Sequence, residues 1–174
     1  MKRTFKIRKL TLPALAIAVI AGFHSCIKNE SFPDTPEIEL VSFVKVYDTG
    51  AYAAKGILTI NFRDGNGDIG LNPGDTLPPY EKGGNYYYNF VIDYFEMQNG
   101  QFIKLDLDPP FSARIPVLTP ENPGKAIKGL ISDTLTLNPF PVFDTIKLEV
   151  YLYDRALNKS NVVSTSAIIL KRYP

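Results

Sequence analysis

Histidine and cysteine are nearly absent from this chain of 174 residues, which holds one of each, His24 and Cys26. Both lie at the end of an N-terminal apolar segment. If that segment is removed as a signal peptide, the mature chain has no imidazole for Ser-His-Asp or Cys-His catalysis or for a zinc site. A single cysteine also leaves no partner for a disulfide bond within the chain. The composition therefore argues against an enzyme of these types.

The chain also lacks an N-terminal apolar run long enough to span a membrane. Residues 10–23 form an apolar stretch of 14 residues that contains Pro13, whereas a membrane-spanning helix needs about 20. A basic start without acidic residues precedes this stretch, and it holds Lys2, Arg3, Lys6, Arg8 and Lys9. A basic start followed by roughly 7–15 apolar residues is typical of a secretory signal. We therefore predict export.

The signal ends at Ser25-Cys26, and this end resembles the lipobox of bacterial lipoproteins, including those of the Bacteroidetes type, in which a small residue precedes an obligatory cysteine. The resemblance implies cleavage before Cys26 and lipidation of its thiol. Two or more acyl chains give stable anchoring, because each buried methylene contributes about 0.8 kcal/mol. The alternative is a secreted protein cut near Ser25 that keeps a free thiol. We predict a lipoprotein signal peptide at 1–25 and an outer-membrane lipoprotein that faces the periplasm or the cell surface.

The predicted mature chain consists of a tether and one domain. Residues 26–37 are the lipidated cysteine and a polar, proline-containing tether, and residues 38–174 are long enough for a single domain. The signal holds five of the 19 basic residues, so fourteen remain against 18 acidic ones, a net charge of about −4. This balance argues against nucleic acid as a partner and is compatible with divalent cations. The expected partners are the membrane, through the anchor, and an unknown protein or carbohydrate.

From Ile38 onward the sequence predicts short β-strands separated by Gly, Pro, Asn and Asp clusters. Apolar and mixed residues alternate most clearly over 145–153, the period of a half-buried strand. The Asn99-Gly100 pair predicts a two-residue hairpin turn between strands at 86–98 and 101–107. Further strands are predicted at 39–47, 58–63, 126–135 and 161–170. About seven strands without a long helix predict an all-β fold, a two-sheet antiparallel sandwich.

Two motifs carry a family resemblance. Residues 62–70, FRDGNGDIG, look like the FxDxDGDIG signature of small Bacteroidetes lipoproteins. Residues 153–161, YDRALNKSN, resemble the D-x-A-G-N-x-S turn of bacterial Ig-like and fibronectin-type domains, with Leu157 in place of the glycine. The resemblance implies an Ig-like sandwich and little about activity, because one fold hosts many functions.

The loop at 64–68 is the segment with recognisable site chemistry. Asp64, Asn66 and Asp68 alternate with glycines, and counting as in an EF-hand makes Asp75 the last ligand of a calcium site. Ile69 stands where an EF-hand has glycine, and no helix pattern flanks the loop, so this is not an EF-hand. The alternative is a turn whose Asp and Asn side chains bond their own backbone.

A second segment bears on the choice between these interpretations. Asp154 and Asn158 would complete a calcium site if the turn after the 145–153 strand lies at the same end of the sandwich as the 64–68 loop.

Two other sets of residues have side chains suited to binding or catalysis. Tyr86, Tyr88 and Tyr94 would stack on a sugar ring or enter a protein interface if they share an exposed face, whereas a strand pattern turns half of such residues toward the core. A glycosidase would need paired carboxylates, for which the candidates are Asp93, Glu96, Asp106 and Asp108.

We therefore expect a non-catalytic, lipid-anchored binding or accessory module of the cell envelope. A structural or assembly lipoprotein and a carbohydrate-processing enzyme are the alternatives.

Overall fold

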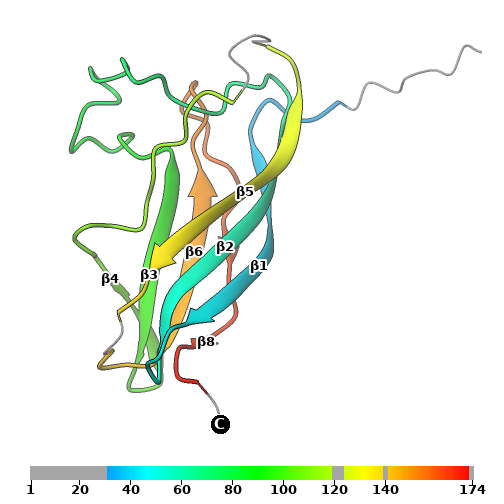
Figure 1. Cartoon of the computed structure of the whole chain (residues 1–174). Helices are drawn as coiled ribbons and strands as arrows, with labels where there is room; N and C mark the ends of the chain where they lie inside the picture. The colour runs from blue at the N-terminus through cyan, green and yellow to red at the C-terminus, as the bar shows by residue number, and fades with distance from the viewer. Residues whose placement is uncertain (1–30, 119–123, 139–140, 173–174) are drawn as a thin grey trace, which may run out of the picture. The chain divides into compact units, whose positions relative to one another are not determined.

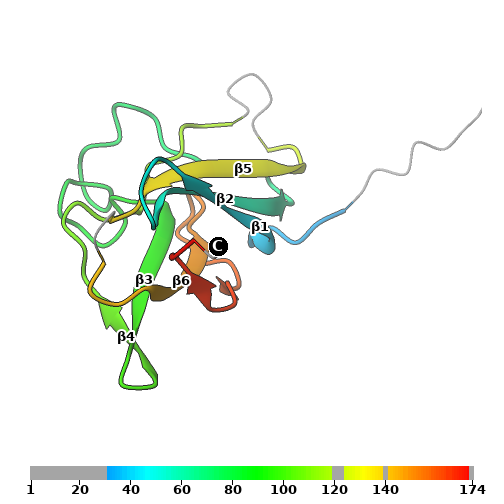
Figure 2. The ribbon, with the colours of Figure 1, turned by 60° about the horizontal axis from the view of Figure 1, so that its bottom comes forward.

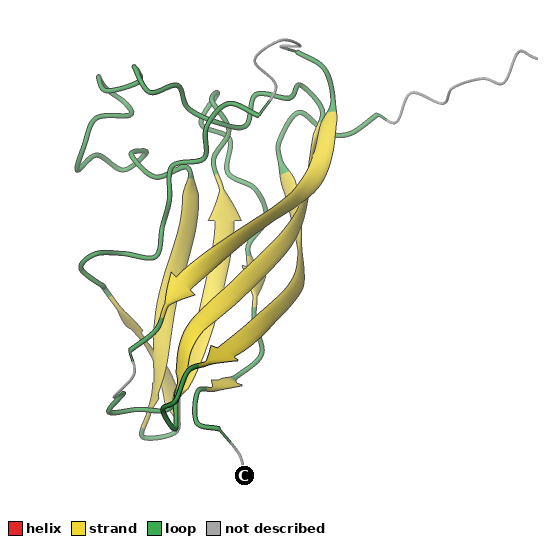
Figure 3. Cartoon of the chain, in the orientation of Figure 1, coloured by secondary structure: helices red, strands yellow, loops and turns green. Residues whose placement is uncertain are grey.

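Figure 1 shows the chain as a computed structural model, which describes residues 31–118, 124–138 and 141–172. The predicted signal peptide and Cys26 lie outside the described residues. Regular structure in the described part is entirely β-strand (Figure 3). The strands are β1 (Glu37–Tyr47), β2 (Ala53–Asp64), β3 (Phe90–Gln98), β4 (Gln101–Leu105), β5 (Ile127–Thr136), β6 (Thr145–Leu152), β7 (Val163–Ser164) and β8 (Ile168–Ile169). Within these ranges no helix is long and apolar enough to cross a membrane.

The eight described strands form two antiparallel sheets. One has the order β1-β2-β5 and the other β4-β3-β6-β7, with β8 also paired to β6. Figure 2 shows β1, β2 and β5 in one layer and β3 and β6 in the other. The first, second and fifth strands thus share one sheet, as strands A, B and E do in an immunoglobulin-type sandwich, and the remaining strands share the other. The predicted all-β, two-sheet antiparallel sandwich is confirmed.

Alternating side chains of the central strands form the core between the sheets. On β6, Ile146, Leu148, Val150 and Leu152 are fully buried, while the residues between them are partly exposed. β2 shows the same alternation with Leu58, Ile60 and Phe62. Because successive side chains of a strand point to opposite faces, each of these strands lends one apolar face to the core.

The predicted strand boundaries hold at most ends and fail at three places. β2 begins at Ala53 instead of residue 58. β3 begins at Phe90 instead of residue 86, because residues 84–89 form turns before the strand. The predicted 161–170 strand is divided into β7 and β8, since Thr165 between them uses its side chain as well as its backbone to bond Leu148 of β6. The hairpin turn at Asn99-Gly100 is as predicted, with φ values of 51° and 83° in the left-handed region that such turns require.

The described chain is ordered against the sandwich before the first strand begins. Gly65 donates its backbone N–H to the carbonyl oxygen of Pro33 over 2.7 Å, and Pro36 is buried. β1 itself begins at Glu37. The part of the predicted tether that the structure describes therefore packs beside the loop that follows β2.

Candidate metal centre

Two loops far apart in the sequence meet at one end of the sandwich. The 64–70 segment, here called the aspartate loop, follows β2, and the turn at 154–158 follows β6 in the other sheet. The backbone N–H of Arg155 donates to the carbonyl oxygen of Asp68 over 3.1 Å. The turn after β6 thus lies at the same end as the aspartate loop, which is the condition under which Asp154 was expected to join the site.

Gly67 determines the path of the aspartate loop. Its φ of 66° lies in the left-handed region, and a Cβ atom at this position would stand 2.0 Å from the carbonyl oxygen of Lys125. Glycine alone reaches this conformation without a steric penalty. Next to it, the N–H of Asp68 donates to Oδ2 of Asp64 over 3.0 Å. One side chain of the loop thus holds the loop's own backbone, as the turn interpretation expects.

This bond leaves the second carboxylate oxygen of Asp64 without a partner. Asp64 is completely buried, and its Oδ1 accepts no hydrogen bond. Four buried side-chain oxygens lack a partner in the described part of the chain, and three of them are the Oδ1 atoms of Asp64, Asn66 and Asp68. An unsatisfied buried polar group costs roughly 1–3 kcal/mol. Three in one loop call for a physical cause, and a hard cation that binds oxygen ligands supplies one.

The carboxylates at this end of the sandwich repel one another. Burial raises the pKa of Asp64 from 3.8 to about 6, and the charges of Asp68 and Asp154 add to the rise, while backbone hydrogen bonds oppose it. Burial and the charge of Asp154 also raise the pKa of Asp68, with a smaller contribution from Asp34. Asp64 and Asp68 are therefore harder to ionise than isolated aspartates, and a bound cation would reverse that effect.

Asp154 organises the turn that it begins. It is 1% exposed, and its two oxygens accept the backbone N–H and the Nδ2 amide of Asn158 over 2.7 and 2.8 Å. Asn158 therefore holds the Asp154 carboxylate in place, and its side-chain amide is used in a hydrogen bond within the turn. Leu157 adopts the left-handed conformation with a φ of 68°, so the turn keeps the geometry of the glycine-containing motif although a leucine occupies the position.

Asp75, the expected last ligand, is engaged elsewhere. Its Oδ2 and Oδ1 accept the two guanidinium nitrogens of Arg155 over 2.6 and 2.9 Å. The bonded Arg155 lowers the pKa of Asp75. Both oxygens are thus used in a bidentate ion pair, which anchors the 72–88 segment to the turn after β6. Asp154, far along the chain, is the acid of the second loop whose charge acts on Asp64 and Asp68.

Asp34 is the acid that sequence reasoning missed. Its charge reaches Asp68, because the 32–33 segment lies against Gly65, where a Cβ atom would stand 2.3 Å from the carbonyl oxygen of Phe32. A lone aspartate in a proline-containing segment gives no signal of its own. The glycine at position 65 is the indirect sign that another backbone segment approaches the loop closely.

The donor set suits calcium better than a transition metal. Carboxylate and amide oxygens are the ligands of hard cations, and calcium tolerates irregular arrangements of six to eight of them. Within the described ranges, no three His, Cys, Asp or Glu side chains are already grouped as a metal site. Binding would therefore draw the carboxylates of Asp64, Asp68 and Asp154 closer together around the ion, with Asn66 contributing an amide oxygen.

The three candidate tyrosines do not share a face. Tyr86 packs edge-on against Tyr153 with ring centroids 5.0 Å apart, and Tyr88 packs against Tyr87 at 4.8 Å. Tyr94 is 7% exposed and turns toward the core, where its hydroxyl donates to Oε1 of Glu96 over 3.2 Å. The structure thus places Tyr94 apart from the other two, as the strand alternation of β3 requires.

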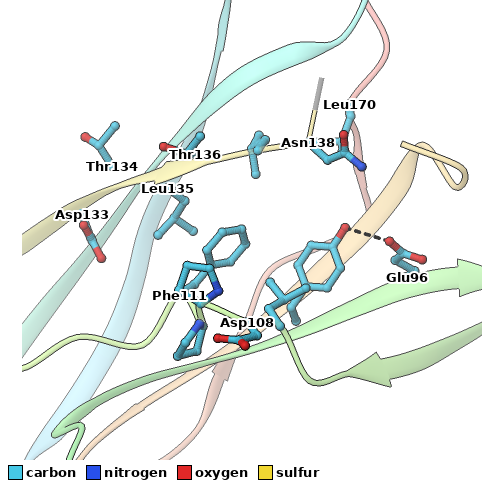
Figure 4. A pocket seen from close by; sticks show the side chains of 14 residues that line it. Glu96, Asp108, Phe111, Asp133, Thr134, Leu135, Thr136, Asn138 and Leu170 are labelled. Atoms are coloured by element: carbon cyan, nitrogen blue, oxygen red, sulfur yellow. Dashed lines mark hydrogen bonds between the residues drawn. The ribbon is translucent and has the colours of Figure 1, made fainter. Parts of the chain in front are cut away.

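The candidate catalytic carboxylates divide between a sheet face and a pocket. Asp93 forms an ion pair with Lys104 over 2.9 Å, and Asp106 is exposed. Glu96 and Asp108 line a pocket of about 600 Å³ together with Asp133 from β5 (Figure 4). A glycosidase needs one carboxylic acid kept protonated by an apolar surrounding, whereas Asp108 is exposed to solvent and Glu96 already accepts the Tyr94 hydroxyl.

Comparison with known proteins adds no relative to these observations. No protein-family model matches the chain, and neither a curated protein nor a solved structure matches it.

Proposed function

We propose that this chain is a non-catalytic, lipid-anchored module of the cell envelope whose Ig-like sandwich binds one calcium ion between the aspartate loop and the turn after β6. The anchor is Cys26, which follows from the resemblance of the signal to a lipobox. The ligands are Asp64, Asn66, Asp68 and Asp154, which sit at the end of the sandwich that receives the chain from its tether.

The observation that carries the metal site is the unpartnered Oδ1 of Asp64. A fully buried carboxylate that faces two further carboxylates is unfavourable in a folded protein unless a positive charge or a proton accompanies it. At neutral pH a pKa of about 6 leaves most Asp64 side chains ionised. A divalent cation then converts the mutual repulsion of the acids into a set of favourable contacts.

The position of the site suggests what the ion does. The aspartate loop touches the turn after β6 through Arg155 and the segment before β1 through Pro33. Calcium would therefore fix three segments from different parts of the sequence at the base of the domain, a few residues from the lipid anchor. The role is structural, and it stiffens the connection between the tether and the sandwich in a calcium-containing exterior.

Thermal unfolding with and without calcium tests the proposal. The purified chain is unfolded in EGTA, in 10 mM CaCl₂ and in 10 mM MgCl₂. Extracellular calcium modules bind with dissociation constants near 10⁻⁴ to 10⁻³ M, so 10 mM calcium should add about 1.4 to 2.7 kcal/mol to the free energy of unfolding. Magnesium should add less, because it demands a tighter octahedral site.

The matched variants are Asp64→Asn and Asp106→Asn. Each replaces a carboxylate by an amide, but Asp64 is buried in the site and Asp106 is exposed away from it. The proposal predicts that only Asp64→Asn removes the calcium shift. A calcium shift of the same size in both variants, or no shift in the wild type, would refute the calcium site. The aspartate loop would then be a turn whose side chains bond its own backbone.

A further inference from the structure

The three-stranded sheet has two edge strands, β1 and β5, and each pairs with β2 alone among the described strands. On the β1 side, the side chain of Asn161 bonds both the N–H and the carbonyl oxygen of Ile38 over 2.8 and 2.9 Å. On the opposite side, β5 pairs with β2 alone among the described strands. An edge strand presents a row of unpaired N–H and C=O groups, to which another extended chain can add.

The register identifies which groups of β5 point outward. Leu137, directly after β5, donates its N–H to the carbonyl oxygen of Ala54 over 2.9 Å. In an antiparallel ladder, hydrogen-bonded and non-hydrogen-bonded pairs alternate, so Leu135 and Asp133 also direct their backbone groups toward β2. Ser132, Thr134 and Thr136 therefore direct theirs away from β2, to the open edge.

The pocket of about 600 Å³ lies beside this open edge and is apolar at its floor. Leu135, Leu137 and Leu170 are almost completely buried there, and Phe111 packs edge-on against the ring of Tyr94 with centroids 5.7 Å apart. Figure 4 shows Leu135 and Phe111 directed into the pocket, with Thr134 and Thr136 on the β5 ribbon beside it. An added strand would thus find backbone partners and an apolar hollow for its side chains together.

The charge of the pocket has one sign. Glu96, Asp108 and Asp133 line it, and no lysine, arginine or histidine does. None of the three acids takes part in an ion pair within the described structure. Asp133 occupies the inward side of β5, where its neighbours two residues away are Ile131 and Leu135. An inward charge on an edge strand discourages indiscriminate pairing, and it accepts a strand that brings a compensating positive charge.

We propose that β5 is the docking edge for an extended peptide segment that carries a lysine or arginine, contributed by a partner protein. The segment pairs with the backbone of Thr134 and Thr136 as a fourth strand of the sheet. Its inward side chains alternate with outward ones, so in antiparallel pairing a basic residue opposite Asp133 is preceded at two-residue spacing by apolar residues opposite Leu135 and Leu137. The proposal is independent of the calcium site, which lies in the aspartate loop.

A labelled peptide tests this proposal directly. The probe is fluorescein-Thr-Val-Thr-Val-Thr-Lys-Thr-amide, which places two valines and a lysine on one face in antiparallel pairing. Binding to the purified chain is followed by fluorescence anisotropy, in EGTA and in calcium. We expect saturable binding in both buffers. A probe with glutamate in place of lysine should bind about tenfold or more weakly, since it meets three carboxylates.

Variants of the chain separate the charge from the backbone contact. Asp133→Asn should weaken binding about tenfold, whereas Asp48→Asn, which removes the same charge from an exposed turn near β1, should leave it unchanged. Thr134→Pro removes one outward N–H and no ladder bond to β2, a position where an edge strand tolerates proline, and should abolish binding. A probe methylated on its backbone nitrogens serves the same purpose without altering the protein.

Three results would overturn the proposal. The first is equal binding of the lysine and glutamate probes, and the second is equal binding of the methylated and unmethylated probes. The third is displacement of the labelled probe by spermidine at the same concentration as by the unlabelled peptide. That result would make the pocket a site for small polycations. Loss of the calcium response with peptide binding intact would refute the metal site alone.

Discussion

Replacing Asp64 by asparagine should make the calcium-free protein more stable at neutral pH, although the change touches a completely buried residue. Asparagine keeps an oxygen for the N–H of Asp68, which now bonds Oδ2 over 3.0 Å. It puts an amide nitrogen where Oδ1 has no partner. The variant also removes the charge that burial and the neighbouring acids oppose.

The magnitude follows from the raised pKa. A rise from 3.8 to about 6 corresponds to about 3 kcal/mol, since each pKa unit is worth about 1.4 kcal/mol. A carboxyl group with a raised pKa in the folded state contributes stability that is fully present below about pH 3.8. That contribution is lost as the pH rises through 6. At pH 7.5 the calcium-free wild type has lost this contribution, because Asp64 is ionised there. Asp64→Asn carries no ionisable group at this position, so its stability does not fall in the same way.

The assay is thermal unfolding in EGTA between pH 4.5 and 7.5. For a domain of this size, 1 kcal/mol moves the melting temperature by about 2–4 °C, so the variant should melt about 6–12 °C above the wild type at pH 7.5. The difference should shrink toward pH 4.5, and calcium should raise the melting temperature of the wild type only. A variant that melts at or below the wild type in EGTA at pH 7.5 would refute the electrostatic reasoning.

Three further predictions concern the anchor and the two loops. Cys26→Ala should release the protein from the membrane fraction and abolish uptake of labelled palmitate, and retention of both would contradict the lipoprotein assignment. Gly67→Ala should lower the free energy of unfolding, measured in urea, by about 2 kcal/mol or more, because its Cβ atom would stand 2.0 Å from the Lys125 carbonyl oxygen. Gly74→Ala is the control and should leave the free energy of unfolding unchanged, because a Cβ atom there has nothing within 4 Å. Leu157→Gly should stabilise the folded chain by about 0.5 kcal/mol, because a φ of 68° is strained for leucine. Ala156→Gly should destabilise it. Equal effects of the two substitutions would contradict the conclusion that Leu157 is strained.

β6 shows what made a strand predictable from the sequence. β6 is central in its sheet, so its alternation of Ile146, Leu148, Val150 and Leu152 reflects a continuous core on one face. The start of β3 and the break between β7 and β8 were not predictable in this way. They depend on turns before Phe90 and on the side chain of Thr165, which are tertiary features without a periodic signal.

The candidate metal centre was predictable in its local part alone. Asp64, Asn66 and Asp68 stand close together in the sequence, and their glycines indicate a loop. Asp154 joins them because β2 and β6 end at the same end of two different sheets, which follows from the topology of the sandwich. Spacing placed Asp75 in the predicted ligand set, but it does not reveal that Arg155 binds both oxygens of Asp75.

Isothermal titration of calcium into the purified chain, beside Asp154→Asn and Asp48→Asn, tests the central claim most directly. The account predicts one ion bound per chain with a dissociation constant near 10⁻⁴ to 10⁻³ M, an unchanged constant in Asp48→Asn and loss of binding in Asp154→Asn. Absence of calcium binding in the wild type, or undiminished binding in Asp154→Asn, would contradict it.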